Sequence, residues 1–156
     1  SRRFINYVHN LRNMNVNVDY AELKKAIDGA KVSYGYQFEY QERTFNIFPH
    51  KHTRQNEKDG ENPAFWQDNS SLGDYDIYIA TNLVKKKFRK PVLLHETLEA
   101  FLQEGFCKGF DKETAIDMAH KIATEYDKLY ARKTLNGELF EEYLQLRKRL
   151  TGFLAR

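Results

Sequence analysis

Residues 91–102 constrain the fold more than any other stretch, because they place ionisable side chains in the middle of an apolar run. The run reads Pro-Val-Leu-Leu-His-Glu-Thr-Leu-Glu-Ala-Phe-Leu. Pro91 suits the first position of a helix and Gly105 provides a stop, so we predict a helix that starts at Pro91 and ends near Glu104. With apolar residues on most of its sides, this helix should be buried. Its ionisable groups are then costly unless they are paired or bind a metal ion.

The spacing of His95, Glu96 and Glu99 indicates a metal site. His95 and Glu99 are four residues apart, which on a helix places their Cβ atoms about 5–6 Å apart on one face. An imidazole nitrogen and a carboxylate oxygen can then bind one ion at roughly 2.0–2.2 Å. Glu96 is turned by about 100° from His95, so it stands beside the ligand pair, where a general base would lie.

His120 is the candidate for the third ligand. A first helix that ends near Glu104 places the ligand pair about 7–14 Å before the turn, and a second helix capped by Asp111 places His120 about 13 Å after it. In an antiparallel pair of helices the three side chains reach the same level. Two neutral histidines and one carboxylate, with a fourth position open to water, are the ligands of many hydrolytic zinc sites. We therefore predict that His95, Glu99 and His120 bind Zn²⁺.

The sequence His95-Glu96-Thr97-Leu98-Glu99, followed by His120, resembles zincin metallopeptidases of the gluzincin type. In that family His-Glu-x-x-His is followed by a Glu ligand on a second helix, so the second and third ligands are exchanged here. The chain is also similar to small zincin-like proteins of bacteria and phages that carry Leu-His-Glu-x-x-Glu-Ala and a downstream His. The resemblance spans residues 75–130.

This resemblance implies a zinc-dependent hydrolase with a peptide or protein substrate and with Glu96 as the general base. In such enzymes a strand before the metal-binding helix commonly forms the edge along which an extended substrate binds. By resemblance, residues 75–80 take that place. The exchange of ligands at Glu99 and His120 keeps two histidines and one carboxylate, so the Lewis acidity of the ion need not differ.

Other interpretations remain open at the level of sequence. A zincin-like protein without catalytic activity could hold the metal structurally or serve as a protein-interaction module. Asp117 and His120 also have the i, i+3 spacing of carboxylate-bridged iron or manganese sites in helix bundles. The four carboxylates of such a site would be Glu96, Glu99, Glu113 and Asp117. Finally, a His and two Glu on a helix are most often surface residues, and the apolar neighbours argue against that interpretation here.

The rest of the chain alternates between two periodicities. Helical spacing predicts helices at residues 2–12, at 19–29 with a capping box of Asp19 and Glu22, after Asp111, and at 138–154. Alternation predicts strands at 32–40, 43–48 and 75–80, with an exposed loop at 49–63 that Phe65 and Trp66 anchor. We therefore predict one α+β domain, residues 1–156. Its small antiparallel sheet of about three strands is packed by helices, two of them metal-bearing.

Composition restricts the partners and the location. The 156 residues carry 25 basic and 22 acidic side chains, and the net charge of +3 is too small to argue for nucleic acid. The basic run at 85–90 is interpreted as a solvated linker. One cysteine, Cys107, fits a reducing compartment, and neither a membrane span nor a signal peptide is evident. We expect a cytoplasmic protein without membrane contact, with residues 138–154 as a candidate dimer contact.

Overall fold

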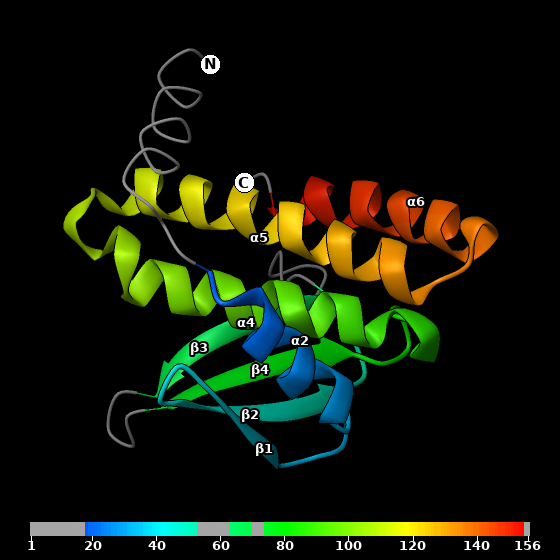
Figure 1. Ribbon diagram of the computed structural model, residues 1–156, viewed down its shortest axis with the longest axis horizontal. Coiled ribbons are helices and arrows are strands. Elements are labelled where there is room, and N and C mark those ends of the chain that lie inside the picture. Colours follow the sequence, from blue (N-terminus) through cyan, green and yellow to red (C-terminus); the bar gives the residue numbers. More distant parts are fainter. Residues whose placement is uncertain (1–17, 53–62, 70–73, 155–156) are drawn as a thin grey trace.

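The computed structural model describes residues 18–52, 63–69 and 74–154, with helices stacked on one face of a sheet (Figure 1). The elements are α2 (Tyr20–Gly29), β1 (Tyr36–Tyr40), β2 (Arg43–His50), β3 (Ala64–Asn69), β4 (Asp74–Ala80), the 3-10 turns η1 (Lys86–Phe88) and η2 (Phe106–Gly109), α4 (Arg89–Glu104), α5 (Lys112–Thr134) and α6 (Gly137–Leu154). The predicted α+β class is confirmed. The helix predicted at residues 2–12 lies outside the described residues.

The sheet has four strands in the order β1-β2-β4-β3. β1 pairs antiparallel with β2, and β3 pairs antiparallel with β4, but β2 and β4 run parallel. The predicted antiparallel sheet of about three strands is therefore a mixed sheet of four, in which the pairing of β2 with β4 departs from the prediction. Alternation shows that a segment forms a strand, whereas the direction of pairing depends on how the connection packs, which alternation does not encode.

β3 lies in a segment that the sequence assigns to the end of a loop. Its register pairs Trp66 with Ile77 of β4. Ala64 is its one buried residue, and Phe65 and Trp66 are half-buried. A strand of six residues with so little buried surface carries a weak alternation signal. The adjacent aromatic pair was the only hint that this segment packs against the sheet.

The predicted hairpin is confirmed as β1 and β2, and its turn uses two residues with positive φ. Gln41 and Glu42 have φ of 51° and 63°, a region that Gly and Asn favour in two-residue hairpins. The carboxylate of Glu22 accepts hydrogen bonds from the Gln41 backbone N–H at 3.2 Å and from its side-chain amide. Glu22 therefore holds this turn instead of closing the predicted capping box. Asp19 does cap α2, since it accepts from the Glu22 N–H at 3.0 Å.

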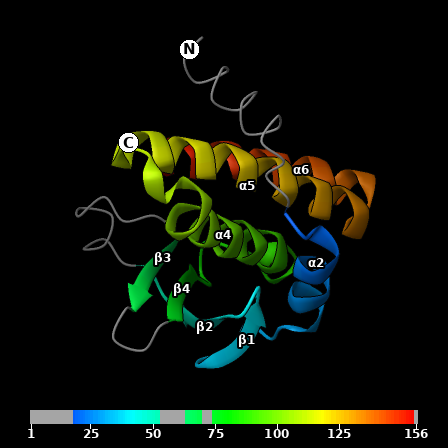
Figure 2. The ribbon, with the colours of Figure 1, turned by 60° about the vertical axis from the view of Figure 1, so that its left-hand side comes forward.

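α4 lies between the sheet and α5 (Figure 2) and is buried along most of its length. Its leucines Leu93, Leu94 and Leu98 have no exposed surface, so the predicted burial of this helix is confirmed. α4 ends at Glu104 as predicted, but it begins at Arg89, before the predicted start at Pro91. A Cβ added at the following Gly105 would lie only 2.9 Å from the Phe101 carbonyl oxygen, which explains the glycine at this stop.

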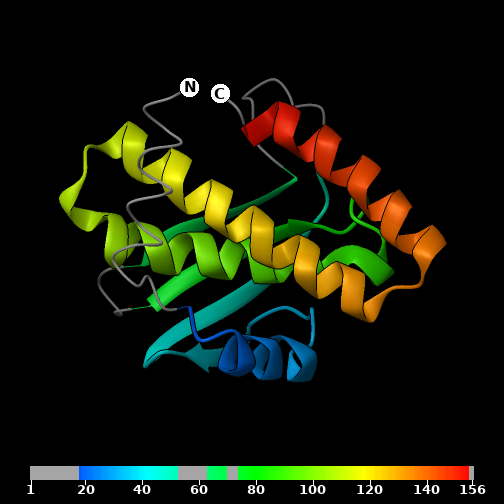
Figure 3. The same ribbon diagram turned by 45° about the horizontal axis from the view of Figure 1, so that its top comes forward.

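The helices that follow α4 return across it. Asp111 caps α5 as predicted, accepting from the Thr114 N–H at 3.0 Å, and α6 folds back beside α5 (Figure 3). The basic run at 85–90 is not a linker, because it forms η1 and the first turn of α4. Lys85 and Lys87 pair with Glu142 of α6 at 2.9 and 3.3 Å. None of the helices within the described ranges is long and apolar enough to cross a bilayer.

Replacing the N-cap Asp111 by Ala should lower the free energy of unfolding by about 1 kcal/mol. The Thr114 N–H and hydroxyl would lose acceptors that lie 3.0 and 2.8 Å away. Asp117→Ala, at an exposed site inside the same helix, is the matched control and should change stability by less than about 0.5 kcal/mol. Urea denaturation measures both, and equal losses would contradict a capping role.

Candidate metal centre

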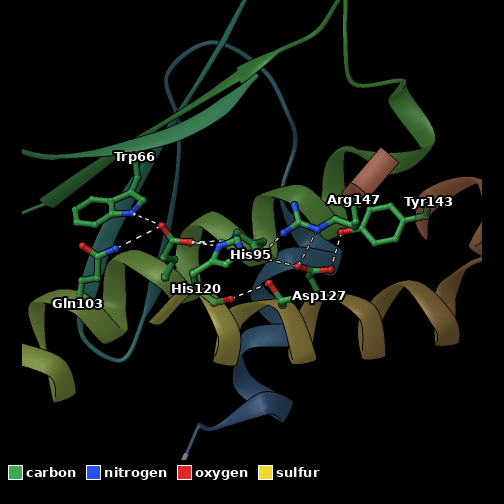
Figure 4. Close-up of polar contacts among 9 residues, drawn as sticks. Trp66, His95, Gln103, His120, Asp127, Tyr143 and Arg147 are labelled. Atoms are coloured by element: carbon green, nitrogen blue, oxygen red, sulfur yellow. Dashed lines mark hydrogen bonds and ion pairs between the residues drawn. The ribbon is translucent and has the colours of Figure 1, made fainter. Parts of the chain in front are cut away.

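Three side chains from two helices converge between α4 and α5 (Figure 4). Nε2 of His95 lies 2.9 Å from Oε2 of Glu99, and Nδ1 of His120 lies 3.2 Å from the same oxygen. One ligand atom from each residue lies within 4.8 Å of the other two. The structure therefore brings together the three residues predicted as ligands from their helical spacing and from their similar distance to the turn between the two helices.

The geometry of this group fits a divalent cation. Two ligands that each bind zinc at about 2.0–2.2 Å with tetrahedral angles lie roughly 3.3–3.6 Å apart. The separations of 2.9 and 3.2 Å at Glu99 Oε2 are close to this range, and the three ligand atoms all lie within 4.8 Å of one another. The site is also sheltered, since His95 is fully buried and the His120 side chain is 20% exposed. Of the three candidate ligands, Glu99 and His120 are the two with some exposed surface.

Asp127 of α5 contacts the other nitrogen of His95. Its Oδ2 lies 2.6 Å from His95 Nδ1, and both side chains are fully buried. From α6, the Tyr143 hydroxyl donates to Asp127 Oδ1 at 2.8 Å, and Arg147 Nε lies 3.4 Å from Oδ2. A carboxylate on the far nitrogen of a metal-binding histidine is a recurrent feature of metal centres, because it fixes the ring and its tautomer.

The sequence gives only a weak indication of the roles of Asp127, Tyr143 and Arg147. Asp127 is seven residues after His120, so both lie on the same side of α5. Asp127 shares its face of the helix with the buried Ala123 and Tyr130. A carboxylate on a buried face indicates a hydrogen-bond or ion-pair partner inside the protein. The contribution of Tyr143 and Arg147 could not be predicted, because it depends on how α6 packs.

The second oxygen of Glu99 is held from the sheet and from its own helix. Trp66 Nε1 of β3 and Gln103 Nε2 of α4 each donate to Glu99 Oε1 at 3.4 Å. Burial alone would raise the pKa of Glu99, but its hydrogen bonds with His120 and His95 outweigh burial and lower it. Glu99 is therefore an ionised carboxylate whose orientation is fixed on both sides.

Glu96 differs from Glu99 in every respect that matters for proton transfer. It is 1% exposed, and its Oε1 has no hydrogen-bond partner among the described residues. Burial, and then the negative charge of Glu99, raises the pKa of Glu96. A buried carboxyl group with one unpartnered oxygen, beside a cluster of candidate ligands, is suited to take up and release a proton.

Charge balance favours a divalent cation in this cluster. With neutral imidazoles, the three buried acidic groups of Glu96, Glu99 and Asp127 face one guanidinium, that of Arg147. A bound cation would offset this excess of acidic groups. With no ion bound, protons must do so. Burial and Arg147 oppose a charged imidazole, yet hydrogen bonds to Asp127 and Glu99 raise the pKa of His95 to about 9.

The alternative of a carboxylate-bridged pair of metal ions finds no support in this geometry. Glu113 and Asp117 are exposed. Within the described ranges, the one group of three or more metal-competent side chains consists of His95, Glu99 and His120. The i, i+3 spacing of Asp117 and His120 does place them near each other along α5, but Asp117 is turned toward solvent.

The predicted substrate edge at residues 75–80 is wrong, because β4 lies inside the sheet between β2 and β3. The edge strand on this side is β3. A cleft of about 660 Å³ opens between β3 and the segment that connects α4 to α5. Trp66 and Gln103 line this cleft, and both donate hydrogen bonds to Glu99. Two residues of the cleft wall therefore contact the candidate ligand Glu99.

Replacing His95 or His120 by Ala should abolish binding of one zinc ion per chain, because each loses a ligand that the remaining two cannot replace. His50→Ala is the matched control, since His50 lies on the other face of the sheet against Phe65 and Tyr78. Metal content after dialysis, measured by mass spectrometry, distinguishes the variants. Stoichiometric zinc in either ligand variant would contradict the assignment.

Comparison of the chain with protein-family models, curated proteins and solved structures found no match. The candidate metal centre is therefore identified by its own geometry.

Proposed function

We propose that the protein is a zinc-dependent hydrolase of the zincin-like kind that cleaves peptide bonds. One observation carries the proposal. His95, Glu99 and His120 converge within ligand distance, and Glu96, on the same helix as the first two, keeps a buried carboxylate oxygen without a partner. Three ligands with a base beside them are the components of a hydrolytic zinc site.

The three ligands have the donor atoms that zinc prefers. His95 and His120 would bind through neutral nitrogens and Glu99 through one carboxylate oxygen. When bound, zinc polarises a carbonyl group and lowers the pKa of water toward about 7. Trp66 and Gln103 hold the other oxygen of Glu99, so its ligand oxygen keeps a fixed direction.

Glu96 would act as the general base. It would take a proton from the attacking water and later deliver that proton to the leaving amine. Its Oε1 has no competing hydrogen bond within the described residues, and burial increases its affinity for a proton. Glu99, three residues further along the helix, has the opposite environment. Two carboxylates with pKa values shifted in opposite directions can divide the roles of ligand and base.

The cleft beside β3 supports a peptide as the substrate class. β3 ends the strand order, so its outer side has no strand partner in the described part of the chain. An extended peptide can add to such an edge through backbone hydrogen bonds, largely independent of its sequence. Gln103 lines the cleft and lies seven residues after Glu96, on the same face of α4. A peptide along β3 would therefore be directed toward the metal centre.

Glu96→Gln should retain zinc and the fold but lower the turnover of an unstructured protein substrate by at least about 100-fold, because an amide cannot accept the proton. The matched control is Glu99→Gln, the same change three residues away. It removes the anionic ligand and should lower zinc affinity.

Zinc content, melting temperature and casein cleavage are measured for both variants and for the unmutated protein. Equal loss of zinc in Glu96→Gln and Glu99→Gln would remove Glu96 from the role of base. Stoichiometric zinc without cleavage by the unmutated protein would overturn the proposed hydrolysis in favour of a non-catalytic, zincin-like interaction module.

A further inference from the structure

We infer that α6 is a functional part of the metal centre: Tyr143 and Arg147 hold Asp127 so that His95 presents its Nε2 lone pair to the ion. This inference rests on the metal site of the proposed function, but not on hydrolysis. It assigns positioning roles to three buried residues, none of which is itself a ligand (Figure 4).

The first step concerns the tautomer of His95. A neutral imidazole carries one proton, on either Nδ1 or Nε2. Oδ2 of Asp127 lies 2.6 Å from Nδ1, and an ionised carboxylate can only accept a hydrogen bond. The proton therefore belongs on Nδ1. The lone pair of Nε2 then points toward Glu99 Oε2, which is 2.9 Å away, where the ion would lie.

The second step explains why Asp127 remains an acceptor. The carboxylate is completely buried, and a buried charge without donors would take up a proton or turn away. Tyr143 donates to Oδ1 at 2.8 Å, and Arg147 Nε lies 3.4 Å from Oδ2. With His95 on Oδ2 as well, both oxygens are occupied. Asp127 therefore keeps one orientation.

Arg147 also contacts His95 directly. Its Nη2 lies 3.2 Å from His95 Nδ1, next to the Asp127 oxygen that faces the same nitrogen. Arg147 therefore constrains both side chains of the His95–Asp127 pair.

The third step links three helices. His95 belongs to α4, Asp127 to α5, and Tyr143 and Arg147 to α6, where they are four residues apart on one face. The Tyr143 ring also lies 5.8 Å from Phe88, just before α4. Among the described residues, the Tyr143 hydroxyl donates its hydrogen bond to Asp127 and not to a candidate ligand, so we expect its effect on zinc affinity to pass through Asp127. By linkage, zinc should in turn stabilise the packing of α6.

The test compares zinc affinity in Tyr143→Phe and Asp127→Asn, measured by competition with a chromogenic chelator. Tyr143→Phe removes one hydroxyl and is the variant that should keep the fold. We expect zinc affinity to fall about 10-fold in Tyr143→Phe and up to about 100-fold in Asp127→Asn. Asp127→Glu should restore part of the loss. Asp117→Asn, an exposed carboxylate on the same helix, is the matched control and should bind as the unmutated protein does.

A second readout excludes a merely structural role. Long-range ¹H–¹⁵N spectra of the zinc-loaded protein should place the His95 proton on Nδ1 in the unmutated chain. A proton on Nε2, or zinc affinities of Tyr143→Phe and Asp127→Asn within twofold of the unmutated protein, would overturn the inference. Zinc binding with these losses but without casein cleavage would overturn only the proposed hydrolysis. Absence of zinc binding in the unmutated protein would overturn both.

Discussion

Burial of charge within α4 is the constraint on which the rest of the structure depends. His95 and Glu96 have almost no exposed surface, and an ion taken out of water without partners costs several kcal/mol. Each neighbouring element supplies part of the compensation. β3 contributes Trp66, α5 contributes Asp127, and α6 contributes Arg147. The polar groups of four elements thus form one connected cluster, in which the loss of one partner leaves another buried group unsatisfied.

The placement of α4 between the sheet and α5 creates this situation. A helix covered on one side would leave some of its carboxylates in water, where their environments would be similar. Covered on both sides, Glu96 and Glu99 experience different surroundings although only three residues separate them. Glu99 meets His95, His120, and the donors from β3 and α4, whereas Oε1 of Glu96 meets no donor that the structure describes. This difference makes one carboxylate suited to bind a cation and the other suited to exchange a proton.

The sheet acts on the site through its edge. β4 lies inside the sheet, between β2 and β3, so β3 is the outermost strand. From β3, the Trp66 side chain reaches Glu99 of α4. The same strand forms one wall of the cleft. One short strand therefore both orients a candidate ligand and borders the approach to it, which explains why an apparently minor segment matters for the candidate centre.

The sequence by itself determined a buried helix that ends at Glu104, with His95 and Glu99 on one face. Both follow from local spacing, because the rise and turn of a helix are fixed along the chain. The convergence of these two residues with His120 follows from the same spacing once the two helices are taken to pack antiparallel. Only the tertiary structure decided the parallel pairing of β2 with β4, the strand at Ala64–Asn69, and the contacts of Asp127 with Tyr143 and Arg147. Those features depend on which elements pack together after long connections. Helical and strand periodicities describe the face that an element buries, but they do not name the element that covers it.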